Sequence, residues 1–305
     1  MWMSIFTSVE VGLMFALMAL GVYLSFRILD FPDLTVDGSF VTGAAVAAIM
    51  LVSGVNPLMA VAAAFAAGFI AGTITGLLHT VGGINPLLSG ILMMIALYSI
   101  NLRIMGAPNV SLLAQDHLFT WIRQGIGGTW SIMIVMVAFV LLVKILLDFF
   151  LKTEFGLALR AVGDNHLMIT SFSGNIHFYK VFGLGLSNGL VAIAGALVAQ
   201  YSGFADVNAG IGMIVIGLAS VIIGEAIFGK KTIIRTTLAV IVGAIIYRII
   251  VALALRVEFL ETGDLKLITA IIVILALVLP KAIAKQKETM RKRQRRLRLS
   301  AQKGA

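Results

Sequence analysis

Nine long apolar runs separated by short polar stretches are the feature that most restricts the fold of this chain. About 20 apolar residues suffice for a helix to cross a bilayer, and a helix satisfies its own backbone hydrogen bonds in lipid. The runs are continuous rather than alternating, which favours helices over a β-barrel. They lie at roughly Ser8–Phe26, Gly38–Val52, Pro57–His79, Pro86–Leu102, Thr129–Leu151, Val181–Tyr201, Gly212–Phe228, Thr236–Leu255 and Leu267–Lys281. We expect an all-α, polytopic membrane helical bundle of about nine spans, and the second and seventh are short enough for one of them to be broken or re-entrant.

The composition supports this class and excludes several chemistries. Hydrophobic residues make up 60% of the chain and charged residues only 12%, more apolar surface than a soluble protein of this size can bury. With no cysteine, the chain has no disulfide, cysteine metal site or thiol nucleophile. No H-E-x-x-H motif or acidic cluster indicates a metal site. The first run lacks a preceding basic segment and carries Glu10, so we expect a retained span rather than a cleaved signal.

Lysine and arginine set the expected orientation. If the basic C-terminal end is cytoplasmic, the inner loops receive Arg27, Lys152, Arg160, Lys180, Lys230, Lys231, Arg235 and the basic residues from Lys281 to Lys303. The outer loops then receive only Arg103, Arg123, Arg256 and Lys266. This positive-inside bias predicts an outer N-terminus and a cytoplasmic C-terminus. Residues 1–284 form the expected membrane domain, and 285–305 a basic tail along the inner lipid surface. The tail accounts for most of the net charge of +9, so no nucleic-acid partner is expected.

The two halves of the chain share short similarities. Phe31–Leu34 precedes the second run as Phe204–Val207 precedes the seventh, and Gly83–Leu87 precedes the fourth as Gly263–Leu267 precedes the ninth. An offset of five spans gives the halves opposite orientations, as in many transporters. We therefore predict an inverted repeat joined by the fifth span and the loop after it.

Three glycine patterns invite different interpretations. Gly68, Gly72 and Gly76 are spaced by four on one face of the third run, which predicts close helix packing. Gly185–Gly189 matches the G-x-S-x-G pattern of serine hydrolases, but it lies in an apolar helix rather than a strand-to-helix turn. Gly224–Lys231 approaches a phosphate-binding loop, but lysine replaces the Ser or Thr that would hold magnesium. We predict no catalytic residue and no nucleotide site in this chain.

Polar residues within the runs are few. Lys144 is near enough to the end of its run to snorkel, and Glu225 can pair with the lysines that follow it. Arg248 lies near mid-depth, where a charge is expensive and usually faces the protein interior. Three interpretations of Arg248 stay open: snorkelling to the outer surface, a structural pair, or a place in the transport pathway. The candidate pathway residues are Asn188, Ser220 and Arg248.

The longest polar segment, 152–180, lies between the fifth and sixth runs. It begins with an amphipathic stretch, breaks at Gly163-Asp164-Asn165 and restarts. Two short helices at a membrane surface would have this pattern. The segment is either a solvated loop or a docking element for a cytoplasmic partner.

Three stretches are distinctive: Asp33–Ser39, Glu154–Asn165 and Asp264–Ala270. With them the chain resembles the permease subunits of bacterial ABC importers of the branched-chain amino acid and ribose type, over nearly its whole length before the tail. It is closest to amino-acid permeases, including tryptophan and tyrosine importers. The resemblance implies a multi-pass permease homodimer in the bacterial inner membrane. Its partners would be a cytoplasmic ABC ATPase dimer, which binds ATP and magnesium, and an extracytoplasmic solute-binding protein.

The resemblance also gives the 152–180 segment a role. It implies coupling helices that contact the ATPase, with the following coupling residues: Arg160, Gly163, Asp164, Asn165, Ser173, Gly174 and Asn175. The expected function is import of a small polar solute, an aromatic or branched-chain amino acid by resemblance. Sugar or nucleoside import, and an ATP-independent channel or facilitator, are the alternatives.

Overall fold

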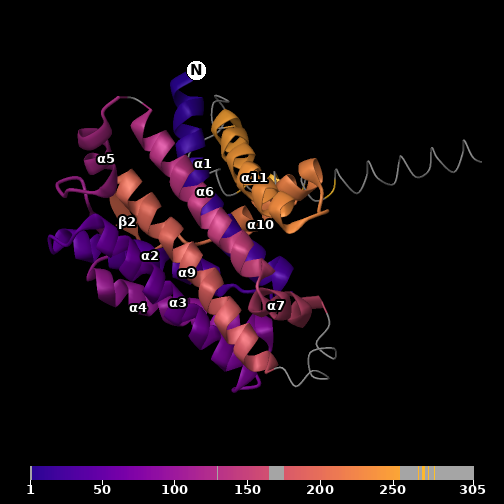
Figure 1. Cartoon of the computed structure of the whole chain (residues 1–305). Helices are drawn as coiled ribbons and strands as arrows, with labels where there is room; N and C mark the ends of the chain where they lie inside the picture. The colour runs from indigo at the N-terminus through magenta and orange to yellow at the C-terminus, as the bar shows by residue number, and fades with distance from the viewer. Residues whose placement is uncertain are drawn as a thin grey trace, which may run out of the picture.

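The computed structural model describes residues 2–128, 130–164 and 175–254, with five single residues, Leu267, Ala270, Ile271, Ile274 and Val278. Within these residues the chain is a helical bundle with two short strands (Figure 1). The elements are α1 (Trp2–Tyr23), η1 (Leu24–Ile28), α2 (Thr35–Val52), α3 (Pro57–Thr80), α4 (Pro86–Met105), β1 (Asn109–Ser111), α5 (Leu118–Ile126), α6 (Ser131–Lys152), α7 (Glu154–Asp164), α9 (Ile176–Ser202), β2 (Phe204–Asp206), α10 (Met213–Phe228) and α11 (Ile233–Ala254). The turn η1 is π-helical and directly continues α1.

The prediction of an all-helical membrane bundle is confirmed, whereas the count of nine spans is not. Seven described helices are long and apolar enough to cross a membrane: α1 with η1, α2, α3, α4, α6, α9 and α11. These match the first six predicted runs and the eighth. The seventh run forms α10, which has only 16 residues. The ninth run, 267–281, lies outside the described residues apart from the five single positions, so nine spans and their orientation stay predictions.

Local sequence explains where several helices begin and end. The side chains of Asn56 and Asn85 each accept a hydrogen bond from the backbone N–H two residues later, and proline follows each of them at the first helical position. This is a favourable helix start, since proline needs no N–H partner there. α4 and α9 end at Gly106 and Gly203, which adopt left-handed φ angles of 68° and 77°. Glycine takes that conformation without steric cost.

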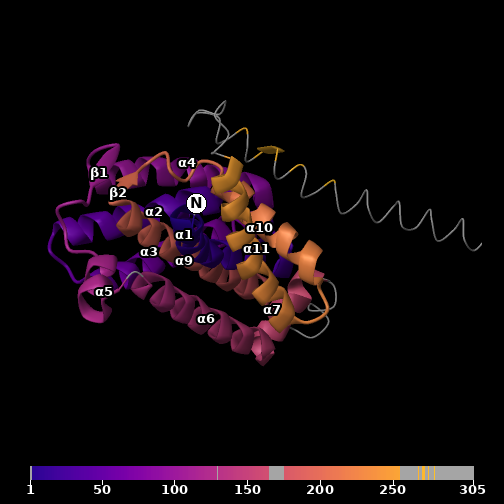
Figure 2. The ribbon, with the colours of Figure 1, turned by 90° about the horizontal axis from the view of Figure 1, so that it is seen from above.

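The centre of the bundle consists of α1, α2 and α9, as the view from above shows (Figure 2). α3 packs along α9, α4 covers α2, and α10 and α11 pack against α1. The glycine face predicted on α3 lies against α9. A Cβ added at Gly68 would overlap Ala192, one at Gly72 would overlap the Leu184 carbonyl oxygen, and one at Gly76 would lie 2.7 Å from the Val181 Cα. The small residues therefore allow the two backbones to approach closely.

The segments paired as an inverted repeat have different local structures. Phe204–Asp206 forms β2, which pairs antiparallel with β1. Phe31–Asp33 is a non-helical connection between η1 and α2 and forms no strand. The repeat stays a prediction, and these two segments do not support it at the level of local structure.

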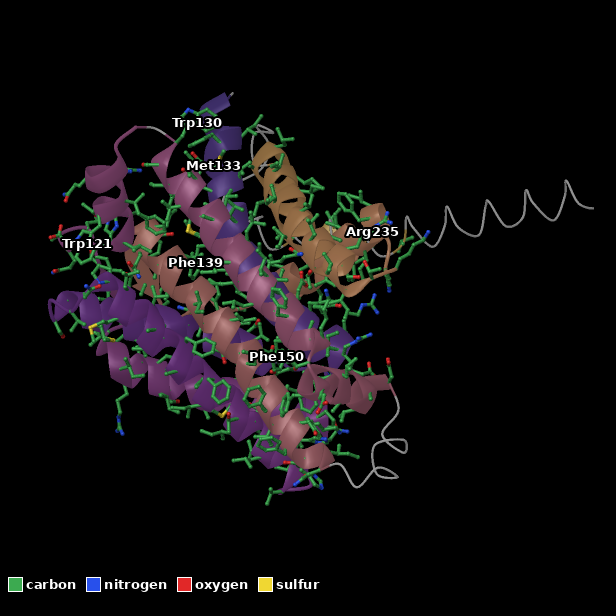
Figure 3. All side chains as sticks on the ribbon, in the orientation of Figure 1. Trp121, Trp130, Met133, Phe139, Phe150 and Arg235 are labelled. Atoms are coloured by element: carbon green, nitrogen blue, oxygen red, sulfur yellow. The ribbon has the colours of Figure 1, made fainter. Side chains whose placement is uncertain are left out.

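Different residues mark the two ends of the molecule. Trp121 and Trp130 lie at the end that holds the N-terminus, and both are exposed (Figure 3). Exposed tryptophans are common at the membrane–water boundary. At the opposite end Lys180 lies 3.2 Å from His79, measured from Nζ to Nε2. In the same region α7 packs against η1.

The α3–α9 contact yields a stability prediction. We expect Gly72→Ala to lower the stability of the folded protein by about 1–3 kcal/mol, the usual cost of overpacking, because the new methyl group would overlap a backbone carbonyl rather than a movable side chain. Gly125→Ala is the matched control, since no atom lies within 4 Å of a Cβ added there. Thermal unfolding of the two variants in detergent measures the difference, and equal midpoints would contradict the packing interpretation.

Candidate functional site

A buried polar network joins the start of α2 to α9. The Asn188 side chain donates from Nδ2 to Asp33 Oδ2 at 2.6 Å and accepts from Ser39 Oγ at 2.7 Å. Asp33 Oδ1 accepts the Thr35 backbone N–H at 2.9 Å. All of these residues are fully buried. Burial raises the pKa of the Asp33 carboxyl, and the hydrogen bonds from Thr35 and Asn188 act in the opposite direction.

A second carboxyl group connects α2 to α10. Asp37 accepts backbone hydrogen bonds from Gly212 at 2.9 Å and from Ile214 at 2.8 Å. These N–H groups belong to the residue before α10 and to its first turn, and they have no partner within the helix. An acidic side chain at a helix N-terminus is also favoured by the helix dipole. Asp37 therefore fixes where α10 begins relative to α2.

Beside this contact lies an apolar cavity of about 580 Å³ between α2, α4 and the segment that follows β2. Its walls include Val41, Met94, Ile95, Tyr98 and Ile211. Its size falls within the range of about 300–1,000 Å³ that is usual for small-molecule pockets. Two of the polar residues on its wall bind backbone groups: Asp37 accepts from Gly212, and Asn101 Nδ2 donates to the Gly38 carbonyl at 3.1 Å. The buried Asn101 Oδ1 has no hydrogen-bond partner among the described residues.

The structure does not bring the three candidate pathway residues together. Asn188 belongs to the network with α2. Ser220, on α10, is buried, and its hydroxyl donates to the Ile216 carbonyl at 2.8 Å. The Arg248 guanidinium lies over the Phe15 ring, with Cζ 4.0 Å from the centroid, and beside a separate cavity of about 170 Å³. This is a cation–π geometry. A pathway role for any of the three stays a prediction.

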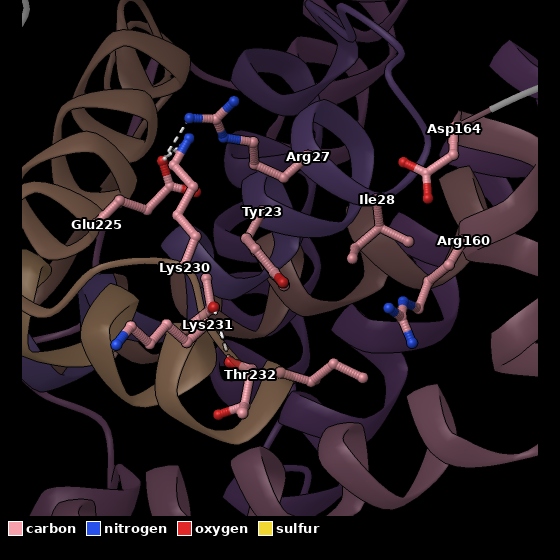
Figure 4. Close-up of a pocket in the computed structure, with 11 residues that line it drawn as sticks. Tyr23, Arg27, Ile28, Arg160, Asp164, Glu225, Lys230, Lys231 and Thr232 are labelled. Atoms are coloured by element: carbon pink, nitrogen blue, oxygen red, sulfur yellow. Dashed lines mark hydrogen bonds and ion pairs between the residues drawn. The ribbon is translucent and has the colours of Figure 1, made fainter.

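Basic residues line a polar cavity of about 360 Å³ at the end opposite the N-terminus (Figure 4). Glu225, buried at the end of α10, pairs with Arg27 on η1 and, at 3.1 Å, with Lys230. The local pair expected with Lys230 is therefore present, but Arg27 from the other half of the chain was missed. Arg160 and Asp164 of α7 line the same cavity. Residues of the predicted coupling segment therefore line the same cavity as residues from both halves of the chain.

Four of the predicted coupling residues lie in the described part of the chain: Arg160, Gly163, Asp164 and Asn175. The other three, Asn165, Ser173 and Gly174, lie outside it. Gly163 is helical and contacts η1 closely, because an added Cβ would overlap the Ile28 carbonyl oxygen. Asn175 is the N-cap of α9, and its side chain accepts a hydrogen bond of 3.3 Å from the Phe178 N–H. The amphipathic stretch predicted at the start of the segment corresponds to α7.

Two further polar residues of the runs, Lys144 and Ser187, are engaged in packing. Lys144 does not snorkel to the surface but forms a buried ion pair with Asp148, one turn later on α6, and Asp148 also accepts from Thr237 of α11 at 2.7 Å. Ser187, the serine of the hydrolase-like pattern, is buried and donates to the Gly21 carbonyl at 2.7 Å. Within the described residues no group of three His, Cys, Asp or Glu side chains is arranged to hold a metal ion.

Comparisons with known proteins agree with the sequence resemblance. A family model described as the branched-chain amino acid transport system permease component matches residues 4–278. The chain is 48% identical over 263 residues to the "Tyrosine transport system permease protein" of Clostridioides difficile (strain R20291), covering 86% of each chain. It is 34% identical over 276 residues to an uncharacterized protein of Rickettsia prowazekii (strain Madrid E), covering 89% of this chain and 95% of that one. No solved structure matches the chain significantly.

The polar network yields a second prediction. We expect Asn188→Leu to lower stability by about 1–3 kcal/mol, because it removes the donor to the Asp33 carboxyl and the acceptor of the Ser39 hydroxyl while both stay buried. Asn208→Leu is the control, since that asparagine is exposed in the segment after β2. The thermal unfolding midpoint and the yield of monodisperse protein in detergent report the difference. A wild-type midpoint for Asn188→Leu would show that the network does not stabilise the bundle.

Proposed function

This chain belongs to the branched-chain amino acid transport system permease family. From that premise we propose that it is the membrane subunit of an ATP-binding cassette importer for aromatic amino acids, with tyrosine as the preferred substrate. It is a multi-pass protein of the bacterial inner membrane. The observation that carries the choice of substrate is the 48% identity to a tyrosine transport system permease over 86% of both chains.

In this proposal the chain itself hydrolyses no ATP. Two copies of the permease form a homodimer, an extracytoplasmic binding protein delivers the solute, and a cytoplasmic ATPase dimer binds ATP and magnesium. The end that carries α7 and the basic cavity is the cytoplasmic one, which agrees with the concentration of Arg27, Arg160, Lys230 and Lys231 there. We also propose that the basic tail, 285–305, which is outside the described residues, follows the same inner surface.

The contact between α7 and η1 supports a route for the conformational signal. Because Gly163 lies directly against the Ile28 carbonyl, a displacement of α7 by the ATPase moves the end of α1. Arg27, in the same turn, pairs with Glu225 of α10, so the displacement also reaches the second half of the bundle. Interfaces packed in this way switch between arrangements rather than deform gradually, which suits alternating access.

Transport can be tested directly. We expect proteoliposomes that contain the permease, its ATPase and its binding protein to accumulate labelled tyrosine only when ATP is enclosed on the ATPase side, with tryptophan competing better than ribose. Uptake without ATP or ATPase would favour the channel or facilitator alternative. Preferential competition by ribose or a nucleoside would overturn the assignment of the substrate class.

The coupling route gives a separate prediction. We expect Gly163→Ala to reduce ATP-dependent uptake by about tenfold or more while the variant still co-purifies with the ATPase, because the added methyl group pushes α7 away from η1. Gly125→Ala, in open space at the other end of the molecule, should transport like the wild type. If Gly163→Ala transports normally, the signal does not pass through this contact; if it loses the ATPase, Gly163 acts in docking instead.

A further inference from the structure

A polar cavity of about 480 Å³ lies at the N-terminal end of the molecule, outside every site described above. It is bounded by α1, α5, the start of α6 and the end of α9, which contribute Phe6 and Glu10, Arg123, Ser131 and Tyr201 respectively. None of the candidate pathway or coupling residues lines it. Its size is in the range of about 300–1,000 Å³ typical of sites for small molecules.

One wall of this cavity presents a carboxyl group that is held in place. Glu10 on α1 is only 4% exposed, and its Oε2 accepts a hydrogen bond of 2.7 Å from the Tyr201 hydroxyl on α9. The Tyr201 ring packs edge-to-face on Phe119 of α5, with centroids 5.4 Å apart. A buried carboxylate is expensive unless a cation or several donors approach it. Its fixed position therefore favours a bound cationic group.

The opposite charge comes from Arg123 on α5. α5 is anchored to the bundle by the buried side chains of Phe119 and Ile122, and by a 3.0 Å hydrogen bond from the Leu118 N–H to Gln200 of α9. Arg123 thus reaches the cavity from a fixed helix, with its side chain exposed. Within the described chain the ion pairs closer than 4 Å do not include one between Glu10 and Arg123. The carboxyl and the guanidinium line one cavity without forming a direct ion pair.

An α-amino acid carries an ammonium and a carboxylate on the same carbon. A carboxyl and a guanidinium on the wall of one cavity match that pair, and guanidinium binds carboxylates through two parallel hydrogen bonds. The aromatic edge of the cavity, where Phe6 packs edge-to-face on Trp130 at 4.8 Å, suits an apolar or aromatic side chain. We propose that this cavity is a binding site for a free, zwitterionic α-amino acid, with Glu10 holding its ammonium and Arg123 its carboxylate.

The inference rests on the proposed function only for the choice of tyrosine as the probe and for the extracytoplasmic position of this end. The headgroup of phosphatidylethanolamine also joins an ammonium to an anionic group, so it shares the chemistry of the proposed ligand. We commit to the free amino acid because the paired charges lie beside an aromatic edge that fits an amino-acid side chain.

The test uses the full-length permease in nanodiscs of phosphatidylcholine and phosphatidylglycerol. Binding of L-tyrosine, L-leucine, N-acetyl-L-tyrosine, which lacks the ammonium, and tyramine, which lacks the carboxylate, is measured by equilibrium dialysis. We expect tyrosine to bind at least tenfold more tightly than either analogue, because each analogue loses one charge-assisted contact. Leucine should also bind, since the charged groups recognise the backbone of the ligand.

Two variants assign the charges. Glu10→Gln keeps an acceptor for the Tyr201 hydroxyl, so folding should be preserved. The variant should bind tyrosine about tenfold more weakly, while its affinity for N-acetyl-L-tyrosine should stay unchanged. Arg123→Gln should weaken the binding of tyrosine to a similar extent and leave the affinity for tyramine unchanged. Asp116→Asn and Arg103→Gln are the controls, since both residues are outside the cavity. Both control variants should bind every ligand as the wild type does.

The outcomes separate the possibilities. If both variants weakened the binding of all four ligands equally, Glu10 and Arg123 would have a structural role, and the proposed site would be overturned. Absence of tyrosine and leucine binding to the wild type would overturn it as well. Tyrosine binding that disappears in discs containing phosphatidylethanolamine would show the lipid headgroup as the occupant and overturn the commitment to a free amino acid. ATP-driven uptake of tyrosine by both variants at wild-type rate would leave the proposed function intact, so the two ideas fail independently.

Discussion

Two carboxyl groups, those of Asp33 and Asp37, satisfy backbone N–H groups where the chain interrupts its helices within an apolar bundle. An unsatisfied backbone donor in such surroundings costs several kcal/mol, so a break in a helix is tolerated only where a partner is supplied. Asp33 supplies one for the start of α2, and Asp37, one turn later, supplies two for the start of α10. The contacts of α2 with α9 and with the start of α10, and with them the shape of the cavity beside α4, depend on these hydrogen bonds.

The sequence predicts the elements of this structure far better than the contacts between them. Apolar length and positive charge are local properties, and they are sufficient for the membrane class and for seven of the expected spans. The spacing of Gly68, Gly72 and Gly76 marks a packing face but does not name α9 as the partner. Lys144 was expected at the surface because a long side chain near the end of a span usually reaches water, whereas Asp148, four residues later, provides a closer partner.

The interactions that were missed join distant parts of the chain. Arg27 and Glu225 are separated by 198 residues, and Glu10 and Tyr201 by 191. In the sequence Glu10 is only an acidic residue near the start of an apolar run, and nothing in the periodicity of α1 indicates a tyrosine opposite it. Gly163 shows the same limit. A break in the pattern after Val162 is visible, but the reason for glycine is the Ile28 carbonyl of another helix. Such reasons become visible only when the helices are placed in space.

The shortness of α10 has a consequence for the lipid around the protein. Its 16 residues extend about 24 Å at 1.5 Å per residue, less than the hydrocarbon thickness of about 30 Å, whereas the 22 residues of α6 extend about 33 Å. Exposed side chains on both helices, such as Val215 and Leu146, face outward. The apolar belt of a single copy is therefore uneven, and acyl chains beside α10 must shorten or tilt to match it. A change in membrane thickness would therefore affect mainly one side of the molecule, the side where α10 and α11 contact the bilayer.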